Sequence, residues 1–277
     1  MVIDFHTHAF PDKIAERTID ILEENTLRES GKKSKAVRAG DVAGLRALMA
    51  QDGVELSVVL PIATTVTQSG SINRFAKELN AQPGLVSFGS VHPMQADWEA
   101  VLEEIHAMGL LGIKLHPEYQ KANIDELESV RILKKCAELG LIVVVHAGAD
   151  IGMPPPVHCR PKQLRSALEQ APGIRLVAAH MGGWRMWDDV ERYLVGQPLF
   201  FDTSFSVTQM APEQARRIIE NHGADRILFG TDSPWEAPRD TLAALAGLEL
   251  SAAELEKIQY KNAAKLLNLP EIPCISR

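Results

Sequence analysis

The chain has 277 residues, of which 45% are hydrophobic and 23% are charged, a composition typical of a globular protein with a sizeable core. Its 29 basic and 36 acidic residues leave a net charge of −7 with no basic run, which argues against a nucleic-acid-binding protein. No apolar stretch approaches the length of a membrane-spanning helix, so we expect no membrane partner.

The three cysteines, Cys136, Cys159 and Cys274, are widely spaced and form no Cys-x-x-Cys pair. This pattern argues against a disulfide framework or a thiolate zinc site, and it fits a reducing compartment. The sequence also begins without a basic segment followed by a long apolar core, so we expect no signal peptide. The expected location is therefore the cytoplasm.

Short apolar runs alternate with longer amphipathic stretches along the whole chain. The runs predict eight strands, most of them apolar on both faces as buried parallel strands are. They cover residues 2–5, 56–62, 85–91, 110–115, 141–145, 174–179, 199–202 and 227–230.

Helical patterns fill the intervals between these strands, and several end at a glycine. They predict helices over residues 11–24, 41–51, 73–80, 96–108, 125–139, 161–170, 184–194, 212–221, 240–248 and 252–267. Asp41 and Ser251 are residues of N-cap type at the starts of two of them. Two irregular insertions remain, a basic stretch at 28–40 that we interpret as a mobile loop and a proline-rich stretch at 149–161.

Eight strands alternating with helices favour an α/β fold of the (β/α)8 TIM-barrel type, with residues 1–277 forming a single domain. The competing architecture is an open doubly wound sheet. The even spacing of the βα units and the lack of a glycine-rich dinucleotide loop favour the barrel.

Metal-competent side chains follow the ends of five predicted strands, where TIM barrels carry their chemistry. They are His6, His8, Lys114, His146, His180 and Asp232. Alternation places them on the inner face, because the apolar neighbours Ile113, Leu115, Val143, Val145 and Phe229 occupy the outer one.

Each of these residues alone has an ordinary structural explanation, such as a hydrogen-bonded core histidine or, for Asp232, a turn residue. However, burying a lysine and an aspartate together beside four histidines costs free energy unless an ion compensates their charges. We therefore interpret the set as a metal site of nitrogen and oxygen donors, suited to zinc, manganese, iron or nickel.

The sequence resembles the amidohydrolase superfamily, and within it the amidohydrolase-related (amidohydrolase 2) branch that includes aminocarboxymuconate semialdehyde decarboxylase. The matching stretches are Ile-Asp-Phe-His-Thr-His at 3–8, Gly-Ile-Lys-Leu-His-Pro at 112–117, Val-His-Ala-Gly at 145–148, Ala-His-Met-Gly-Gly at 179–183 and Phe-Gly-Thr-Asp at 229–232. The helix at 262–267 is also similar to the last helix of that branch, so the resemblance runs from residue 2 to about residue 268.

The resemblance implies a distorted TIM barrel whose divalent metal is held by His6, His8, His146 and Asp232. In that family the residue matching His180 contacts the reacting water or a second metal. The decarboxylase relatives typically lack a lysine at the position of Lys114, whereas binuclear relatives such as dihydroorotase carry a carbamylated lysine there. The sequence therefore leaves open one or two ions, and Lys114 as a carbamate or as a plain ammonium.

Two reactions suit this site. In metal-dependent hydrolysis of an amide, lactone or ester, Asp232 is the general acid/base and His180 orients the water or stabilises an oxyanion. In non-oxidative decarboxylation, a carboxylic acid loses carbon dioxide and is protonated at carbon. We expect hydrolysis, with zinc as the first choice of metal, keep decarboxylation as the alternative, and rank a non-catalytic metal-binding barrel last.

Aromatic and basic residues that follow strand ends are candidates for binding a cyclic, carboxylated small molecule. They are His116, Arg160, Trp184, Arg185 and Trp235. For each of them the alternative is loop packing or a solvated charge. The expected partner is thus a small-molecule substrate, and the sequence is compatible with a homodimer.

Overall fold

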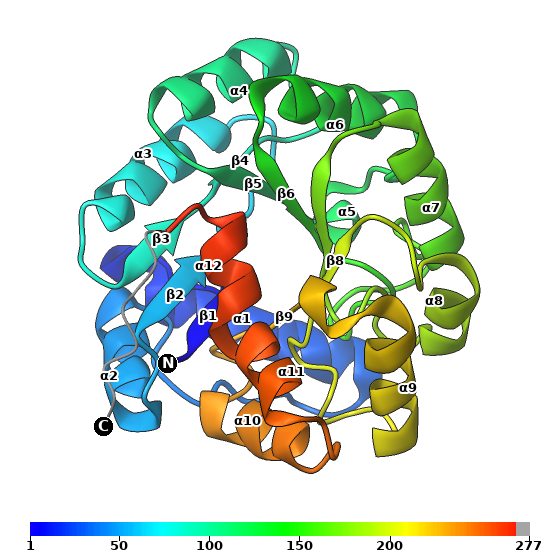
Figure 1. Cartoon of the computed structure of the whole chain (residues 1–277). Coiled ribbons are helices and arrows are strands. Elements are labelled where there is room, and N and C mark those ends of the chain that lie inside the picture. Colours follow the sequence, from blue (N-terminus) through cyan, green and yellow to red (C-terminus); the bar gives the residue numbers. More distant parts are fainter. Residues whose placement is uncertain (270–277) are drawn as a thin grey trace.

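A computed structural model describes residues 1–269 and shows parallel strands surrounded by helices (Figure 1). The strands are β1 (Ile3–Thr7), β2 (Leu56–Val59), β3 (Leu85–Ser87), β4 (Gly89–Ser90), β5 (Gly112–Leu115), β6 (Ile142–Val145), β7 (Arg175–Ala178), β8 (Phe200–Asp202) and β9 (Ile227–Leu228). β3 and β4 together are the predicted third strand, interrupted at Phe88, whose N–H donates to Val59 O at 3.0 Å. Each predicted strand is therefore confirmed, although several are shorter than expected.

The strands pair in two parallel groups, β1-β2-β3 and β4-β5-β6-β7-β8-β9. Backbone hydrogen bonds join the first strand to the segment after the last, since Phe5 N–H donates to Phe229 O and Asp232 N–H donates to His6 O, both at 2.8 Å. A parallel bridge between Thr7 and Ser233 extends this contact. The barrel thus closes between the two ends of the chain, which confirms the predicted (β/α)8 architecture against the open sheet.

The helices are α1 (Asp12–Ser30), α2 (Val42–Asp52), α3 (Ser69–Asn80), α4 (Trp98–Ala107), α5 (Pro117–Gln120), α6 (Leu127–Leu139), α7 (Pro161–Gln170), α8 (Trp187–Tyr193), α9 (Pro212–His222), α10 (Pro238–Ala246), α11 (Ala252–Glu256) and α12 (Asn262–Leu266). The predicted helices appear in the predicted order, with one short helix, α5, that was not predicted, and with the helix predicted over 252–267 divided into α11 and α12. A 3-10 turn, Ala224–Arg226, precedes β9, and a π-helical segment, Lys257–Lys261, joins α11 to α12. Asp41 and Ser251 cap α2 and α11 as predicted. Cys274 lies outside the described residues.

Side chains alternate along the strands between two separate apolar cores. Ile113, Leu115, Val143 and Val145 pack outward against the helices, as predicted. A second core fills the barrel, and α12 closes its N-terminal end with its own apolar residues (Figure 1). The polar residues that follow the strands are left at the opposite, C-terminal end.

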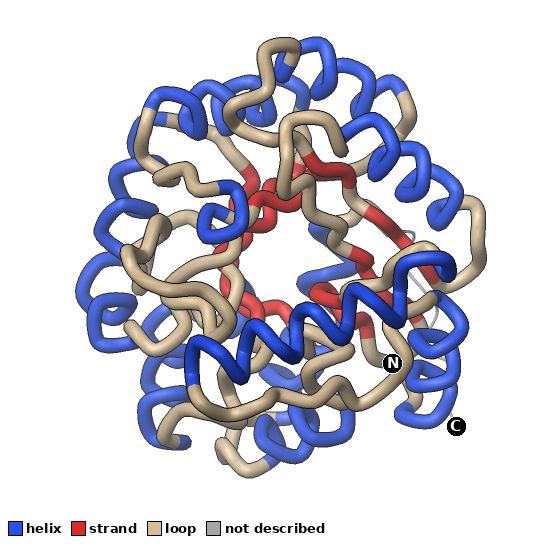
Figure 2. The backbone as a smooth tube through the Cα atoms, turned by 180° about the vertical axis from the view of Figure 1, so that it is seen from behind, coloured by secondary structure: helices blue, strands red, loops and turns tan. Residues whose placement is uncertain are grey.

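α1 lies across that C-terminal end of the barrel (Figure 2). It is longer than predicted, because it continues to Ser30 and is capped by Gly31 in the left-handed conformation. The predicted basic loop at 28–40 therefore begins later, and Arg38 anchors it by donating to the Ser233 hydroxyl at 2.8 Å and to the His8 carbonyl. Within residues 1–269, no helix is both long and apolar enough to cross a membrane.

Candidate metal centre

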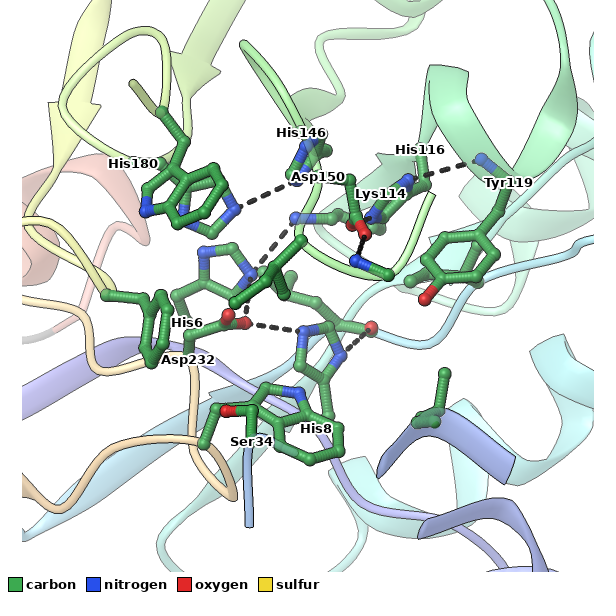
Figure 3. Close-up of a pocket in the computed structure, with 18 of the residues that line it drawn as sticks. His6, His8, Ser34, Lys114, His116, Tyr119, His146, Asp150, His180 and Asp232 are labelled. Atoms are coloured by element: carbon green, nitrogen blue, oxygen red, sulfur yellow. Dashed lines mark hydrogen bonds and ion pairs between the residues drawn. The ribbon is translucent and has the colours of Figure 1, made fainter. Parts of the chain in front are cut away.

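The predicted strand-end residues meet in one cavity of about 200 Å³ at the C-terminal end of the barrel (Figure 3). All six line it: His6, His8, Lys114, His146, His180 and Asp232. A cavity of this size holds one six-membered ring with small substituents, since about 150 Å³ suffices for benzene.

His6 is buried and oriented by a carboxylate on its outer side. Its Nδ1 donates to Asp202 Oδ2 at 2.9 Å, which leaves the Nε2 lone pair facing inward. That nitrogen lies 3.0 Å from Lys114 Nζ and 3.3 Å from Asp232 Oδ1. Burial is the main reason that the pKa of His6 falls to about 4, so the ring is neutral at physiological pH.

His8 is held in the same way by a backbone carbonyl. Its Nδ1 donates to Leu60 O at 2.9 Å, and its Nε2 lies 3.0 Å from Asp232 Oδ1. Burial alone would raise the pKa of Asp232, but the imidazoles of His8, His6 and His180 hold it below its usual value. Asp232 is therefore a carboxylate among nitrogen donors.

His146 and His180 complete the ring of imidazoles. His146 Nε2 donates to Ala149 O at 3.2 Å, and His180 Nδ1 donates to Ser204 O at 3.0 Å. Their other nitrogens face each other at 3.0 Å. With the protons assigned outward, two lone pairs meet at this distance and repel each other.

This arrangement fits a divalent cation. With protons assigned in this way, His6, His146 and His180 each present an unprotonated nitrogen to the cavity, which is the form in which histidine binds metal. Donor atoms of His6, His8 and Asp232 lie within 4.8 Å of one another, close enough to share one ion. A bound cation also relieves the repulsion between the inward nitrogens of His146 and His180.

Lys114 is fully buried at the end of β5, beside His6. Burial lowers its pKa to about 8, against the opposing effects of Asp202 and Asp232. A substantial fraction of this amine is thus neutral near pH 8, and only the neutral amine can react with carbon dioxide to form a carbamate. The geometry is compatible with both forms of Lys114 that the sequence left open.

The backbone is unusual at two of the six strand-end residues. His180 has φ 60° and Asp232 has φ 64°, in the left-handed region that non-glycine residues seldom occupy. Such conformations cost of order 1–3 kcal/mol and occur often at functional sites. They turn both side chains off their strands and toward the cavity, as Figure 3 shows for the imidazole and the carboxylate.

Sequence reasoning missed Asp202 and Ser204, which support the site from β8 and the residues after it. Asp202 Oδ1 accepts from the backbone N–H of His180 at 3.0 Å and from the Ser204 hydroxyl. The signal was available, since Asp202 is a carboxylate at the end of a predicted strand, like Asp232.

Asp150 was also missed. It lies in the proline-rich loop, lines the cavity, and places Oδ2 3.4 Å from His116 Nε2 (Figure 3). The His116 ring is stacked on that of His146, with ring centroids 4.1 Å apart and an angle of 13° between planes. Nothing in the spacing of Asp150 marks it, because a loop has no strand register to give its direction.

The predicted substrate-binding residues divide into two groups. His116, Trp184 and Trp235 line the cavity. Arg160 and Arg185 do not, and this corrects the expected arginine clamp. Both arginine side chains are exposed. Arg160 precedes α7, and Arg185 stacks on the Trp184 ring at 4.3 Å from its centroid. The tryptophan thus faces the cavity while the arginine next to it in sequence points to solvent.

Comparison with solved structures shows several similar barrels. A 5-carboxyvanillate decarboxylase from Sphingomonas paucimobilis is 16% identical, with a TM-score of 0.71 over 97% of this chain and 99% of the other. A dihydroxybenzoic acid decarboxylase from Polaromonas, with bound manganese and the inhibitor 2-nitroresorcinol, is 17% identical, with a TM-score of 0.68 over 97% of both chains. A protein from Pseudomonas putida, described as a 2-pyrone-4,6-dicarboxylic acid hydrolase, is 17% identical, with a TM-score of 0.66 over 96% of this chain and 97% of the other.

At these identities the similarities to solved structures establish the fold. No curated protein matches the chain. The amidohydrolase model for the branch that the sequence resembles matches residues 3–269. That range contains the strands that close the barrel and the strand-end histidines and aspartate that converge in its cavity. The protein therefore belongs to the amidohydrolase family.

Proposed function

We propose that this protein is a metal-dependent, non-oxidative decarboxylase of a small aromatic or unsaturated carboxylic acid. The observation that carries the proposal is the convergence of four imidazoles and the ionised carboxylate of Asp232 on one small cavity. The cavity fits a single ring. Decarboxylases among the similar barrels support this reaction over the hydrolysis that the sequence alone favoured.

The metal ligands in this proposal are His6, His8, His146 and Asp232, with His180 beside them. Zinc and manganese both suit these donors, and a similar decarboxylase binds manganese. When bound, the ion supplies a positive charge that fixes and polarises the oxygens of the substrate. Lys114 adds a second positive charge, or a bridging anion if it is carbamylated.

Decarboxylation breaks the bond between the ring carbon and the carboxyl carbon. The electron pair stays on the ring carbon, carbon dioxide leaves, and a proton adds to that carbon. Asp232 is the proposed carrier of this proton: ionised in the resting site, it accepts a proton from an acidic group of the substrate and returns it to carbon. His180 positions the reacting group by hydrogen bonding.

Hydrolysis is the second candidate, because the same carboxylate can remove a proton from a water molecule. The similar barrel from Pseudomonas putida is described as a hydrolase of a pyrone, a cyclic ester. In that reaction Asp232 passes the proton of the water to the leaving group. The substrate and the product distinguish the two reactions.

The test is incubation of protein loaded separately with zinc and manganese with pools of aromatic acids, unsaturated acids and lactones, followed by mass spectrometry. Loss of carbon dioxide from one acid supports decarboxylation, and gain of water by a lactone supports hydrolysis. Asp232→Asn should remove the activity, whereas Asp188→Asn, an exposed residue, should not. Absence of carbon dioxide loss from every pool, or equal activity of Asp232→Asn and wild type, would refute the decarboxylase.

A further inference from the structure

The cavity contains one polar pair that the proposed reaction does not use, His116 and Asp150. Donor atoms of both residues lie with one of His146 in a second group that could hold an ion, separate from the group formed by His6, His8 and Asp232. In Figure 3 the pair lies to one side of Asp232 and His6, next to Tyr119. Both residues line the cavity, so both can contact a substrate.

The hydrogen bonds of the pair define its chemistry. His116 Nδ1 accepts from the backbone N–H of Tyr119 at 3.4 Å, so Nε2 carries the ring proton and points toward Asp150 Oδ2 at 3.4 Å. Asp150 Oδ1 accepts from Gly152 N–H at 2.7 Å. A carboxylate offers about four lone-pair sites, so Asp150 keeps accepting capacity for one more donor.

The pair is rigidly held. Glu118, buried at α5, accepts from the backbone N–H of His158 at 2.7 Å and pairs with its Nδ1 at 2.8 Å. This ties the proline-rich loop to the barrel. The two ends of the loop are joined by a hydrogen bond from Gly148 N–H to Cys159 O at 2.8 Å. A fixed acceptor discriminates between ligands better than a mobile one, because it cannot move to avoid an unfavourable group.

The charges around Asp150 also discriminate between substrates. No arginine lines the cavity among the described residues, and the lysine that lines it, Lys114, lies beside His6 in the proposed metal centre. Asp150 accepts a hydrogen bond from Gly152 N–H and lies 3.4 Å from His116 Nε2, and it pairs with no arginine or lysine side chain among the described residues. Burial raises the pKa of Asp150 to about 7, against an opposing effect of Lys114, so above that pH a second carboxylate on the ring would meet a negatively charged, half-buried side chain there.

We infer that Asp150 is a specificity-determining residue that accepts a hydrogen bond from a hydroxyl or amino substituent of the substrate and excludes a second carboxylate. His116 is its positioning residue. This inference rests on the proposed function for the placement of the first carboxylate at the metal centre. It narrows the substrate to a one-ring monocarboxylic acid with a neutral hydrogen-bond donor.

The experiment measures binding by calorimetry to manganese-loaded protein, at a pH above the value of about 7 to which burial raises the pKa of Asp150. The probes are benzoate, the three monohydroxybenzoates and the three benzenedicarboxylates. A hydrogen bond to a charged group changes affinity about 10- to 100-fold, so one hydroxybenzoate should bind at least about 10-fold more tightly than benzoate. Each dicarboxylate should bind at least about 10-fold more weakly than benzoate.

Asp150→Asn should reduce several-fold both the preference for the hydroxybenzoate over benzoate and the preference for benzoate over the dicarboxylates. The variant keeps an acceptor for Gly152 N–H but loses the negative charge. Asp150→Ser provides a second variant if the first folds poorly, and Asp188→Asn is the matched control. Unchanged preferences in both Asp150 variants would overturn the inference, as would tight binding of a dicarboxylate or no binding of any probe.

Binding and turnover separate this inference from the proposed function. If the preferences depend on Asp150 but no acid loses carbon dioxide, the specificity role stands and the decarboxylase fails. If carbon dioxide is released while the Asp150 variants retain wild-type preferences, the decarboxylase stands and the specificity role fails.

Discussion

Each imidazole of the candidate metal centre is oriented by an acceptor on its far side. For His6 that acceptor is the buried carboxylate of Asp202, and for His8 it is the carbonyl of Leu60. Acceptors of this kind fix which nitrogen carries the proton and make the other nitrogen a better ligand. We therefore expect residues behind the site to influence its metal affinity, although they do not contact the ion themselves.

Asp202→Asn should weaken metal binding about 10- to 100-fold, because an amide polarises the His6 ring less than a carboxylate does. The measurement is competition for zinc against a chelator of known affinity, with the melting temperature recorded for each protein. Asp188→Asn supplies the control for an exposed aspartate. Wild-type affinity in a folded Asp202→Asn variant would contradict the assigned role of Asp202.

His222 offers a prediction about stability and pH. It is buried, stacked on Phe201 with ring centroids 4.0 Å apart, and burial lowers its pKa to about 4. Above about pH 6.5 the ring is neutral in both the folded and the unfolded chain, so it contributes no pH dependence. As the pH falls from 6.5 toward 4, the unfolded chain takes up a proton that the folded chain does not, and stability is lost.

Between pH 7 and pH 5, the free energy of unfolding of His222→Gln should therefore fall by about 2 kcal/mol less than that of wild type. Glutamine can replace both hydrogen bonds of the ring, to Gly196 N–H and to Leu199 O. Urea unfolding at the two pH values measures the difference. His106→Gln, on the exposed face of α4, should match wild type, and identical pH slopes for all three proteins would exclude His222 as the cause.

At the scale of elements, strand ends were predictable and loop directions were not. A strand has a period of two, so a polar residue at its end can be assigned to the inner face from its neighbours alone, as for Lys114 and His146. Arg160 and Arg185 follow the strands through turns of irregular backbone, and both point to solvent instead of into the cavity. Asp150 reaches the cavity from the middle of a loop that carries no periodic signal.

α12 shows how an element far from the site supports it. Its residues Ala263 and Leu266 pack with Ile3 and Val58 inside the N-terminal end of the barrel. Strand alternation could not predict this, because the contact joins a terminal helix to the interior instead of to the outer face of the sheet. α12 therefore packs against strands whose opposite ends carry the candidate metal ligands.

Leu266→Ala should lower the free energy of unfolding by about 2–5 kcal/mol, the range for deletion of a buried leucine side chain. Leu127→Ala is the matched control, since Leu127 is 72% exposed and Leu266 is 6% exposed. Denaturant unfolding measures both. A loss for Leu266→Ala no larger than that for Leu127→Ala would show that α12 does not stabilise the barrel interior.

At the scale of the whole molecule, the first strand is a closing element of the barrel. β1 pairs with β2 on one side, and on the other side it bonds to the segment after β9. His6 and His8 lie on this strand, and the loop anchor Arg38 reaches the His8 carbonyl. The sequence predicted these ligands as a pair, but it could not show the backbone bonds that join them to Asp232.

Deletion of residues 2–8 should remove the fold and the metal together. The deletion opens the barrel and leaves the backbone groups of β2 without partners, in addition to removing two histidines. Circular dichroism and metal analysis of the purified variant are the measurements, with the double variant His6→Ala/His8→Ala as a control that removes ligands alone. A deleted protein that unfolds cooperatively and binds stoichiometric metal would refute this view of β1.

The contact between β1 and the segment after β9 has a consequence for how the protein is synthesised. His8 and Asp232 are in contact across 224 positions of sequence. Synthesis proceeds from the N-terminus, so the ribosome exposes both histidines long before it has made their carboxylate partner. A chain arrested anywhere before residue 232 holds an unclosed barrel and a histidine pair without its aspartate. The candidate ligand group can therefore form only late in biosynthesis, after translation has passed Asp232.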